Sequence, residues 1–337
     1  MGKAVRMADI AERLNISVVS VSKALAGKPG VSEEMRARVV ALAKEMGYEG
    51  FRPADEMAES RNIGILVADR FFSENTFYSK MYRALMLDSV KSDLTCMLEI
   101  VPLEAEKSAS LPALVVKRKV DGIIFMGDLD QKYLQTVAES GLPCLLLDFH
   151  TPEGSWVSIL SDNAIGGYAL TRHLLSTGHR EIGFVGSILA TSSIMDRYLG
   201  YLQGVLSVGI TPRVEWRLED RDRDGHFIPL QLPETLPQAF VCNCDAVAYN
   251  LVDALEKRGI RVPEDVAVCG YDDFSSAPPS RVPLTSYRVG VEDMGRAAID
   301  LMKRLLQGYI TCTDMLADLH NKPFAVHCNL KSVLNIW

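Results

Sequence analysis

The chain of 337 residues lacks the features of a membrane, fibrous or disulfide-linked protein. None of its apolar runs approaches the roughly 20 residues that a helix needs to span a bilayer. Residues 1–14 alternate charged with apolar side chains, so we expect no signal peptide. Aromatic residues are sparse at 7 %, whereas hydrophobic residues reach 48 % and charged residues 23 %. These proportions predict a globular chain of about two domains and exclude disordered, collagen-like and small disulfide-rich proteins.

Motifs for catalysis, metal binding and nucleotide binding are also missing. The seven cysteines are odd in number and scattered, which favours a reduced chain in the cytoplasm. Cys242 and Cys244 lack a second pair at zinc-ribbon spacing, so we interpret them as small buried thiols. No H-x-x-x-H spacing, G-x-S-x-G elbow or phosphate-binding glycine motif after a strand occurs. The sequence therefore predicts no catalytic residue, no metal and no cofactor, and we interpret the charged segment 219–224 as a solvated loop or lobe surface.

The net charge of −7 is unevenly distributed along the chain. Residues 1–48 carry 8 Lys and Arg against 5 Asp and Glu, whereas residues 49–61 carry 2 against 4. Residues 62–337 carry 26 against 34. Proteins that bind DNA need positive charge only where they contact phosphate, so the acidic total does not exclude DNA. These differences suggest a basic module at 1–48, a linker at 49–61 and a larger acidic body at 62–337.

The basic module has the pattern of three short helices. A turn follows the first helix, because Asn15 tolerates the left-handed conformation of a tight turn and Ser17 is a good N-cap. A second helix is expected over residues 18–25, and a third after a cap at Ser32. Two short helices joined in this way are typical of a helix-turn-helix, whose second helix enters the major groove of DNA. The buried side of the first helix is formed by Met7, Ile10, Ala11 and Leu14.

This segment resembles the DNA-binding headpiece of the LacI/GalR family of bacterial transcription regulators. The D-I-A of the first helix, the S-x-x-x-V-S-K-x-L of the second, the G-K-P-G-V-S-E-E loop and the closing G-Y agree in order and spacing. Two valines in the second helix can offer only apolar contact, for example to thymine methyl groups. The resemblance implies that Val18, Val19 and Lys23 read base edges, and that Arg6, Ser17, Ser20 and Ser22 hold phosphates.

The linker departs from the family pattern. In the family, a hinge helix with the sequence motif P-N-x-x-A-R-x-L folds when the protein binds its operator, and it inserts a leucine into the minor groove. Residues 53–60 instead read Pro-Ala-Asp-Glu-Met-Ala-Glu-Ser, without the expected Asn, Arg and Leu. Three carboxylates repel the phosphates, and Met57 is the only apolar wedge available. The sequence leaves open whether Met57 inserts or whether the hinge does not insert.

The acidic body alternates short apolar runs with helical segments, as parallel sheets covered on both faces do. We expect two α/β lobes, lobe 1 at about 62–160 and 291–318 and lobe 2 at about 161–290 and 319–337, with a ligand cleft between them. A last strand is expected at 323–328. The other predicted strands are 63–67, 121–126, 144–147, 182–185, 239–241 and 266–269, and the clearest helices are 164–176, 246–258 and 292–306.

Polar and aromatic residues follow several of these strands. Ligands of open α/β sheets bind at the carboxyl ends of the strands, so residues at these positions are candidates for a binding site. Aromatic faces, carboxylates and a guanidinium together suit a polyhydroxy ligand. Arg197 is expected to open the helix after the strand at 182–185. The other strand-end candidates are Phe72, Asp148, Cys244, Asp245 and Asp272.

The body also resembles the LacI/GalR family, through "HLLSTGHREIGFVG", "RYLG", "EKRGIRVPEDVAVCGYDDF" and "PLTSYRVGVEDMGRAAIDLM". The resemblance covers nearly the whole chain and implies a core like that of periplasmic binding proteins. It implies that Asp148, Arg197 and Asp272 contact the effector and that Phe77 forms an aromatic wall. Cys244 stands where the family usually has Asn, so an ordinary hexose cannot be presumed as the effector.

The sequence therefore predicts an α/β protein: a three-helix helix-turn-helix headpiece followed by a two-lobed parallel α/β core. The predicted function is a cytoplasmic, nucleoid-associated DNA-binding repressor whose operator binding a sugar or polyol modulates. We expect a homodimer on a pseudo-palindromic double-stranded operator, without a membrane partner. The alternatives are a periplasmic solute-binding protein with the same core, a cytosolic enzyme on that core, or a regulator whose hinge does not insert.

Overall fold

The structure is a computed structural model in which the chain divides into an N-terminal unit, Met1–Arg61, and a core unit, Asn62–Trp337. Among the helices of the part described, none is long and apolar enough to cross a membrane. The residues that the structure describes are 7–25, 31–46, 61–72, 77–154, 156–274, 283–307 and 334–335.

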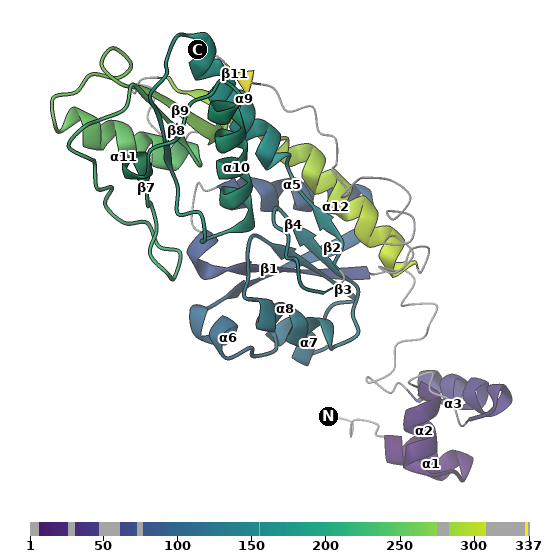
Figure 1. Cartoon of the computed structure of the whole chain (residues 1–337). Helices are drawn as coiled ribbons and strands as arrows, with labels where there is room; N and C mark the ends of the chain where they lie inside the picture. Colours follow the sequence, from purple (N-terminus) through teal and green to yellow (C-terminus); the bar gives the residue numbers. More distant parts are fainter. Residues whose placement is uncertain are drawn as a thin grey trace. The chain divides into compact units, whose positions relative to one another are not determined.

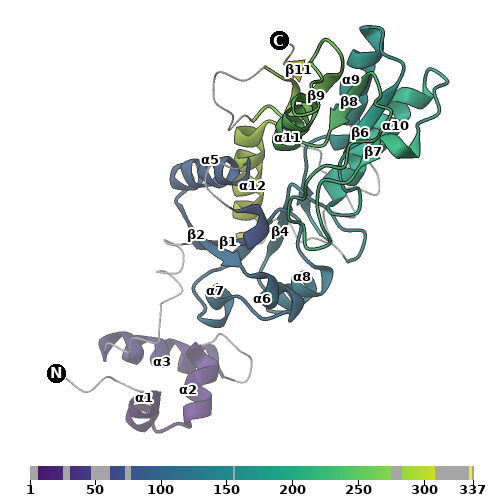
Figure 2. The same ribbon diagram turned by 90° about the vertical axis from the view of Figure 1, so that its left-hand side faces the viewer.

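The N-terminal unit contains the three predicted helices, α1 (Met7–Leu14), α2 (Val18–Leu25) and α3 (Glu33–Glu45). Figure 2 shows the three helices grouped together, and the apolar side chains of each helix pack against those of the other two. This small core excludes water from short helices that would be marginal alone. Its buried members are Ile10, Ala11, Val21, Ala24, Val39 and Ala43.

Local hydrogen bonds fix the turns between these helices. Asn15 has a φ of +51°, the left-handed conformation expected for it. The Ser17 hydroxyl accepts a hydrogen bond from the Ser20 amide at 3.0 Å and so caps α2. The Ser32 hydroxyl accepts from the Met35 amide at 3.3 Å at the start of α3. The predicted caps and the helix-turn-helix geometry are therefore confirmed.

The first lobe of the core unit is a five-stranded sheet in the order β2-β1-β3-β4-β5. The pairs β1–β3, β3–β4 and β4–β5 are parallel. Figure 1 shows α6, α7 and α8 on one face of this sheet and α5 and α12 on the other. The strands are β1 (Arg61–Ala68), β2 (Leu94–Val101), β3 (Gly122–Met126), β4 (Cys144–Leu147) and β5 (Ser158–Ile159), and the helices are α5 (Phe77–Lys91), α6 (Leu103–Lys107), α7 (Ala113–Val116), α8 (Gln131–Ala138) and α12 (Val291–Leu306).

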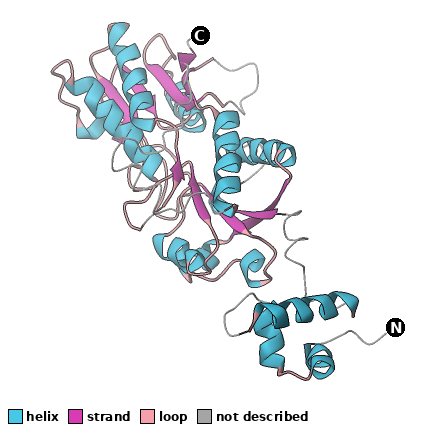
Figure 3. Cartoon of the chain, turned by 90° about the vertical axis from the view of Figure 1, so that its right-hand side faces the viewer, coloured by secondary structure: helices cyan, strands magenta, loops and turns pink. Residues whose placement is uncertain are grey.

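The second lobe is a six-stranded sheet in the order β11-β10-β9-β8-β6-β7. Its pairs are parallel except for β10–β11, which is antiparallel. The two sheets are visible as separate groups of strands in Figure 3. The strands are β6 (Ile182–Val185), β7 (Arg217–Leu218), β8 (Ala239–Cys242), β9 (Ala267–Asp272), β10 (Thr285–Arg288) and β11 (Leu334–Asn335), and the helices are α9 (Asn163–Ser176), α10 (Ser192–Leu206) and α11 (Asp245–Glu256).

The chain passes between the lobes more than once. After β10 in lobe 2 it returns to lobe 1, where α12 packs against α5, β3 and β4. It then forms β11 beside β10. All six strands predicted from the short apolar runs are present, whereas β2, β5, β7, β10 and β11 were not predicted. The strand expected at 323–328 lies outside the described residues.

Candidate functional site

A cavity of about 380 Å³, here called the inner cavity, lies between the two lobes of the core unit. Side chains that follow strands of both sheets line it, as expected for an open α/β fold. Three of the five strand-end candidates (Asp148, Cys244 and Asp272) line it, as do Arg197 and Phe77. The other lining residues are Arg70, Phe71, Tyr78, Thr191, Ser193, Ile194, Arg221, Gly225, Phe227, Asn243, Ala246 and Phe274.

Aromatic rings form one part of the wall. The Tyr78 ring lies 5.4 Å from that of Phe71 and 5.3 Å from that of Phe77, centre to centre. Phe227 comes from lobe 2 and remains 55 % exposed. Such rings can stack against the apolar C–H face of a small ligand.

Asp148 directly follows β4 and is buried, with 2 % of its surface exposed. Its backbone has a φ of +70°, a strained conformation that is often found at functional sites. The Tyr78 hydroxyl donates to Asp148 Oδ2 at 2.9 Å, whereas Oδ1 has no hydrogen-bond partner among the described residues. Burial raises the pKa of this carboxyl to about 6. The residue is therefore an acceptor with unused capacity.

Arg197 links three parts of lobe 2. It lies in the second turn of α10, which begins at Ser192, so it does not open the helix as predicted. Its Nε donates to Asn163 Oδ1 at 2.8 Å and its Nη1 to the Asn243 carbonyl at 2.6 Å. The guanidinium carbon lies 3.8 Å from the centre of the Tyr271 ring, a cation–π contact. These contacts hold a buried cation in one orientation.

Asp272, the last residue of β9, is the anionic partner of Arg197. Its Oδ1 lies 3.4 Å from Arg197 Nη1 but has no hydrogen-bond partner among the described residues. Like Asp148 it has a positive φ, here +100°. Burial raises the pKa of the Asp272 carboxyl to about 7, although Arg197 opposes this shift. A second buried oxygen at the cavity thus lacks a donor.

Arg221 is a lining residue that the sequence interpretation missed. The expectation that residues 219–224 form a solvated loop or lobe surface is wrong for Asp220 and Arg221, because Asp220 is 1 % exposed and Arg221 lines the cavity. Asp220 accepts hydrogen bonds from the Ser187 amide, the Asn243 side chain and Arg221 Nε at 2.7–3.0 Å. The signal was hidden because Arg221 follows β7, a strand of only two residues.

Two predicted residues do not line the inner cavity. Phe72 packs edge-on against Tyr82, with ring centres 5.9 Å apart. Asp245 starts α11 and accepts hydrogen bonds from the Phe274 amide at 2.8 Å and the Ser286 hydroxyl at 2.7 Å. It sits so close to the backbone of β9 that a Cβ on Gly270 would come within 1.9 Å of its Oδ1. Its contacts place Asp245 among residues that brace the end of β9.

The described cysteines form no disulfide bond. Cys242 and Cys244 are buried free thiols, as predicted, and burial raises the pKa of Cys244 to about 12. Arg221 Nη2 lies 4.0 Å from Cys244 Sγ. Within the described part of the chain, no three His, Cys, Asp or Glu side chains form a group that could hold a metal ion.

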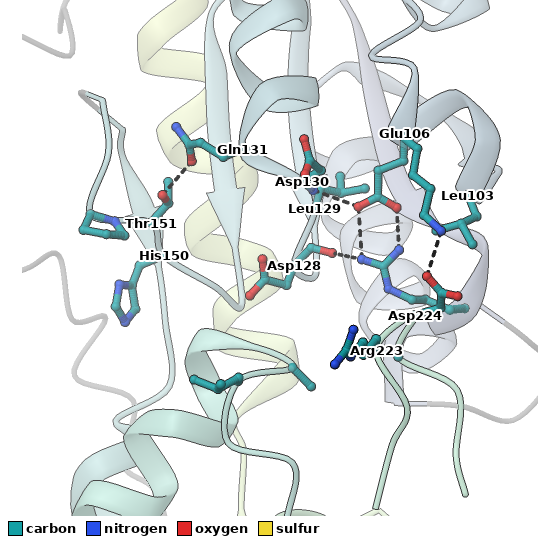
Figure 4. Close-up of a pocket in the computed structure, with 16 residues that line it drawn as sticks. Leu103, Glu106, Asp128, Leu129, Asp130, Gln131, His150, Thr151, Arg223 and Asp224 are labelled. Atoms are coloured by element: carbon teal, nitrogen blue, oxygen red, sulfur yellow. Dashed lines mark hydrogen bonds and ion pairs between the residues drawn. The ribbon is translucent and has the colours of Figure 1, made fainter.

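A second cavity between the lobes, here called the outer cavity, has a volume of about 480 Å³. Lys107 Nζ and Asp224 Oδ1 form an ion pair across it at 2.8 Å, and Arg70 pairs with Glu106 through two hydrogen bonds (Figure 4). Both cavities are lined by Arg70 and Gly225. A Cβ on Gly225 would come within 2.8 Å of Arg70 Cδ, so Gly225 lies close to the Arg70 side chain where the two cavities meet.

The N-terminal unit presents a separate candidate face on α2. Val18 is 47 % exposed and Lys23 is exposed, whereas Val21 on the other side of the helix is fully buried. Val19 and Ser22 lie on the same helix, and Ser17 and Ser20 lie at its start. The predicted contacts Arg6 and Met57 lie outside the described residues.

Together these features define a class of protein: a helix-turn-helix DNA-binding unit combined with a two-lobed α/β unit that has a ligand-sized cavity. A family model for the bacterial regulatory proteins of the lacI family matches residues 6–50. A model for the periplasmic binding protein-like domain matches residues 171–314. The chain is therefore similar to lacI-family regulatory proteins over residues 6–50 and to periplasmic binding protein-like domains over residues 171–314, which supports a DNA-binding transcription regulator that a small ligand modulates.

Individual relatives agree with this assignment over most of the chain. An HTH-type transcriptional repressor PurR of Glaesserella parasuis is 26 % identical over 89 % of each chain. A ribose operon repressor of Haemophilus influenzae is 26 % identical over 89 % of this chain and 91 % of its own. Among solved structures, the fold is similar to that of a CelR–cellobiose complex (TM-score 0.63, 23 % identity, 91 % and 94 % coverage) and a lac repressor dimer bound to operator (0.60, 22 %, 91 % and 94 %).

Proposed function

We propose that this protein is a homodimeric transcriptional repressor of the bacterial cytoplasm and nucleoid, catalysing no reaction, whose inner cavity binds a sugar or polyol. The observation that carries the proposal is a set of three buried acceptor oxygens without hydrogen-bond partners among the described residues. They belong to three lining residues, Asp148, Asn243 and Asp272. Unpaired buried oxygens cost free energy, and the hydroxyl groups of a bound polyol would supply the missing donors.

The proposed ligand contacts combine these oxygens with the other lining groups. Arg197 and Arg221 are the donors for ligand oxygens, and Phe77 is the apolar wall for a sugar ring. Relatives support a small polar ligand, since solved structures of similar fold are described with cellobiose and ribose. Cys244 is proposed as a ligand contact, whereas Phe72 and Asp245 are not, because they do not line the cavity.

On the DNA side, we assign base contacts to α2 and phosphate contacts to its flanks. Val18 and Val19 would contact thymine methyl groups and Lys23 a base edge. Two headpieces of a dimer would meet half-sites about one helical turn apart on a pseudo-palindromic operator. Arg6, Ser17, Ser20 and Ser22 are the proposed phosphate contacts, and Met57 is the proposed wedge in the minor groove if the hinge inserts.

Ligand and DNA would be coupled by linkage. A ligand that contacts both lobes favours one arrangement of the lobes over another. The change that it causes in DNA affinity is limited by how much more tightly it binds one arrangement than the other. The contacts reach the cavity from both sides, with Asp148 from lobe 1 and Arg197 and Asp272 from lobe 2.

A thermal-unfolding screen of sugars, polyols and nucleosides tests the proposal, because a ligand of the folded state raises Tm as its concentration rises. Asp148→Asn should weaken binding of any compound found by about tenfold or more. Asp69→Asn is the matched control, since Asp69 also follows a strand but is exposed and does not line the inner cavity. Equal loss in both variants, or no stabilising polyol in the screen, would contradict the proposed cavity.

A further inference from the structure

The three arginines that line the inner cavity are each held by a carboxylate. Two of these carboxylates, Glu106 and Asp220, are buried behind the lining, with 3 % and 1 % of their surface exposed. The third lines the cavity itself. An arginine paired in this way brings little net positive charge to a ligand, although its remaining N–H groups can still donate. The pairs are Arg70 with Glu106, Arg197 with Asp272 at 3.4 Å, and Arg221 with Asp220 at 3.0 Å.

Asp148 is the carboxylate left over from this pairing. Among the described residues no cation lies within 4 Å of it, and its hydrogen bond comes from the neutral Tyr78 hydroxyl. Four carboxylates therefore face three guanidinium groups at or directly behind the wall, an excess of one negative charge when all four carboxylates are ionised. A buried carboxylate without a cation is costly unless a ligand supplies the positive charge.

The hydrogen-bonding atoms of the cavity that lack partners among the described residues are all acceptors, which agrees with this excess of negative charge. The three lining atoms without partners are the Oδ1 oxygens of Asp148, Asn243 and Asp272. An amide oxygen and the oxygens of an ionised carboxylate can only accept hydrogen bonds. An incoming phosphate or carboxylate would place further acceptors beside them and add charge of the same sign. A ligand rich in N–H and O–H donors would satisfy them.

We propose that the effector is a polyhydroxy molecule that bears a protonated amine, in chemical class an amino sugar, and that the ammonium group lies against Asp148. Sugars that carry phosphate or carboxylate groups are excluded from the inner cavity. This inference rests on the proposed function, because it assumes that the inner cavity is the effector site, and it specifies the charge of the ligand.

The ionisation of the cavity carboxyl groups makes ligand affinity depend on pH, which is a second test of the inference. The pKa of Asp148 is raised by burial and by Asp128 and lowered by Arg197 and Tyr78. The pKa of Asp272 is raised by burial and Asp148 and lowered by Arg197 and Arg221, and Asp245 lies beside it. An ammonium group favours the ionised carboxylates, so its binding releases protons below about pH 7. Affinity for an amine should therefore rise from pH 5 to pH 7.

The experiment is calorimetric titration of the full-length protein with three matched sets of sugars. Each set contains a neutral hexose (glucose, galactose or mannose), its 2-amino derivative and its 6-phosphate. We expect at least one amino sugar to bind about tenfold or more tightly than its neutral parent at pH 7, with proton release, and no 6-phosphate to bind. Tighter binding of a neutral sugar or a 6-phosphate would overturn the inference.

Variants separate this inference from the proposed function on which it rests. Asp148→Asn should abolish the preference for the amine, so that amino sugar and parent bind alike, whereas Asp69→Asn should preserve it. If neutral sugars bind best and Asp148→Asn still weakens them, the proposed function stands and the amine inference falls. If no member of any set binds, the amine inference falls, and the thermal-unfolding screen of sugars, polyols and nucleosides decides the proposed function separately.

Discussion

The two cavities between the lobes differ in chemistry more than in size. The outer cavity is the larger, at about 480 Å³ against 380 Å³. Four of its charged groups form ion pairs with one another, Lys107 with Asp224 and Arg70 with Glu106. The inner cavity has aromatic walls and three buried oxygens that lack donors. Volume alone would select the outer cavity, whereas unsatisfied polar groups select the inner one.

The two cavities also differ in how exposed their ion pairs are to solvent. In the inner cavity the ion pair Arg197–Asp272 is buried, with side chains 7 % and 10 % exposed. In the outer cavity the ion pair Lys107–Asp224 joins the lobes with side chains 57 % and 45 % exposed. An exposed pair is screened by water and contributes little, whereas breaking a buried pair leaves an uncompensated charge. The comparison therefore predicts unequal effects of mutation.

Arg197→Ala should have the largest effect of the changes considered. It leaves Asp272 without its cation and removes hydrogen bonds to Asn163 and Asn243. The free energy of unfolding of the core unit should fall by about 3–5 kcal/mol, with loss of the ligand response. Lys107→Ala is the control in the outer cavity and should change Tm little. Equal losses of stability, measured by thermal unfolding, would contradict the contrast between the cavities.

The stability of the ligand-free protein should fall as pH rises from 5 to 8. Burial raises the pKa of Asp148 to about 6 and that of Asp272 to about 7, so the folded state holds protons that the unfolded state has released. Stability from these groups is complete below about pH 4 and is lost as pH rises through 6 and 7. At about 1.36 kcal/mol per pKa unit, the expected loss is on the order of 4 kcal/mol, read from Tm against pH.

Asparagine variants assign this pH dependence to one cavity or the other. Asp128 lines the outer cavity, and burial also raises its pKa to about 6, so Asp128→Asn and Asp148→Asn should each flatten the profile. A saturating amino sugar should suppress the contribution of Asp148 and leave that of Asp128. If the ligand acts on the Asp128 contribution instead, the effector binds in the outer cavity.

Arg221→Gln and Arg223→Gln compare the cavities within one short loop. Arg221 lines the inner cavity and is paired with Asp220, whereas Arg223 is exposed and lines the outer cavity. Arg221→Gln should weaken ligand binding about tenfold, the loss of roughly 1.4 kcal/mol, because a charged donor is removed. Arg223→Gln should change the affinity less than about twofold. A larger effect of Arg223→Gln in calorimetric titration would move the site to the outer cavity.

This loop also shows where prediction from the sequence ends. Elements with a strong local pattern were predictable: α2 matches its expected bounds, and the strands with continuous apolar runs were found. Acidic and basic residues alternate over residues 220–224. A solvated loop and a buried network of ion pairs can both have this pattern, so the pattern does not distinguish them. Asp220 is buried because the Ser187 amide and the Asn243 side chain donate to it from neighbouring strand ends, and such distant partners leave no local signal.

The strand-end rule selected the cavity residues with partial success for a related reason. It identified Asp148, Cys244 and Asp272, which line the inner cavity, but also Phe72 and Asp245, which do not. A position after a strand places a residue at the correct edge of the sheet. Whether its side chain faces the cavity or braces the next strand, as Asp245 does beneath Gly270, depends on packing between strands.

Gly225→Ala should have the smallest effect and tests the boundary between the cavities. Gly225 has a φ of +87°, and a Cβ there would come within 2.8 Å of Arg70 Cδ, whose guanidinium is fixed by Glu106. The backbone conformation alone costs roughly 1 kcal/mol for a residue other than glycine, and the contact opposes close approach of the lobes. Ligand affinity should fall about twofold to fivefold, because binding to both lobes would then require Arg70 to shift.

Gly209→Ala is the matched control. Gly209 also has a positive φ, +76°, but a Cβ there meets nothing within 4 Å, so this variant should lower stability without changing ligand affinity. Equal ligand affinity in the two variants would mean that the contact between Arg70 and Gly225 does not limit closure of the inner cavity.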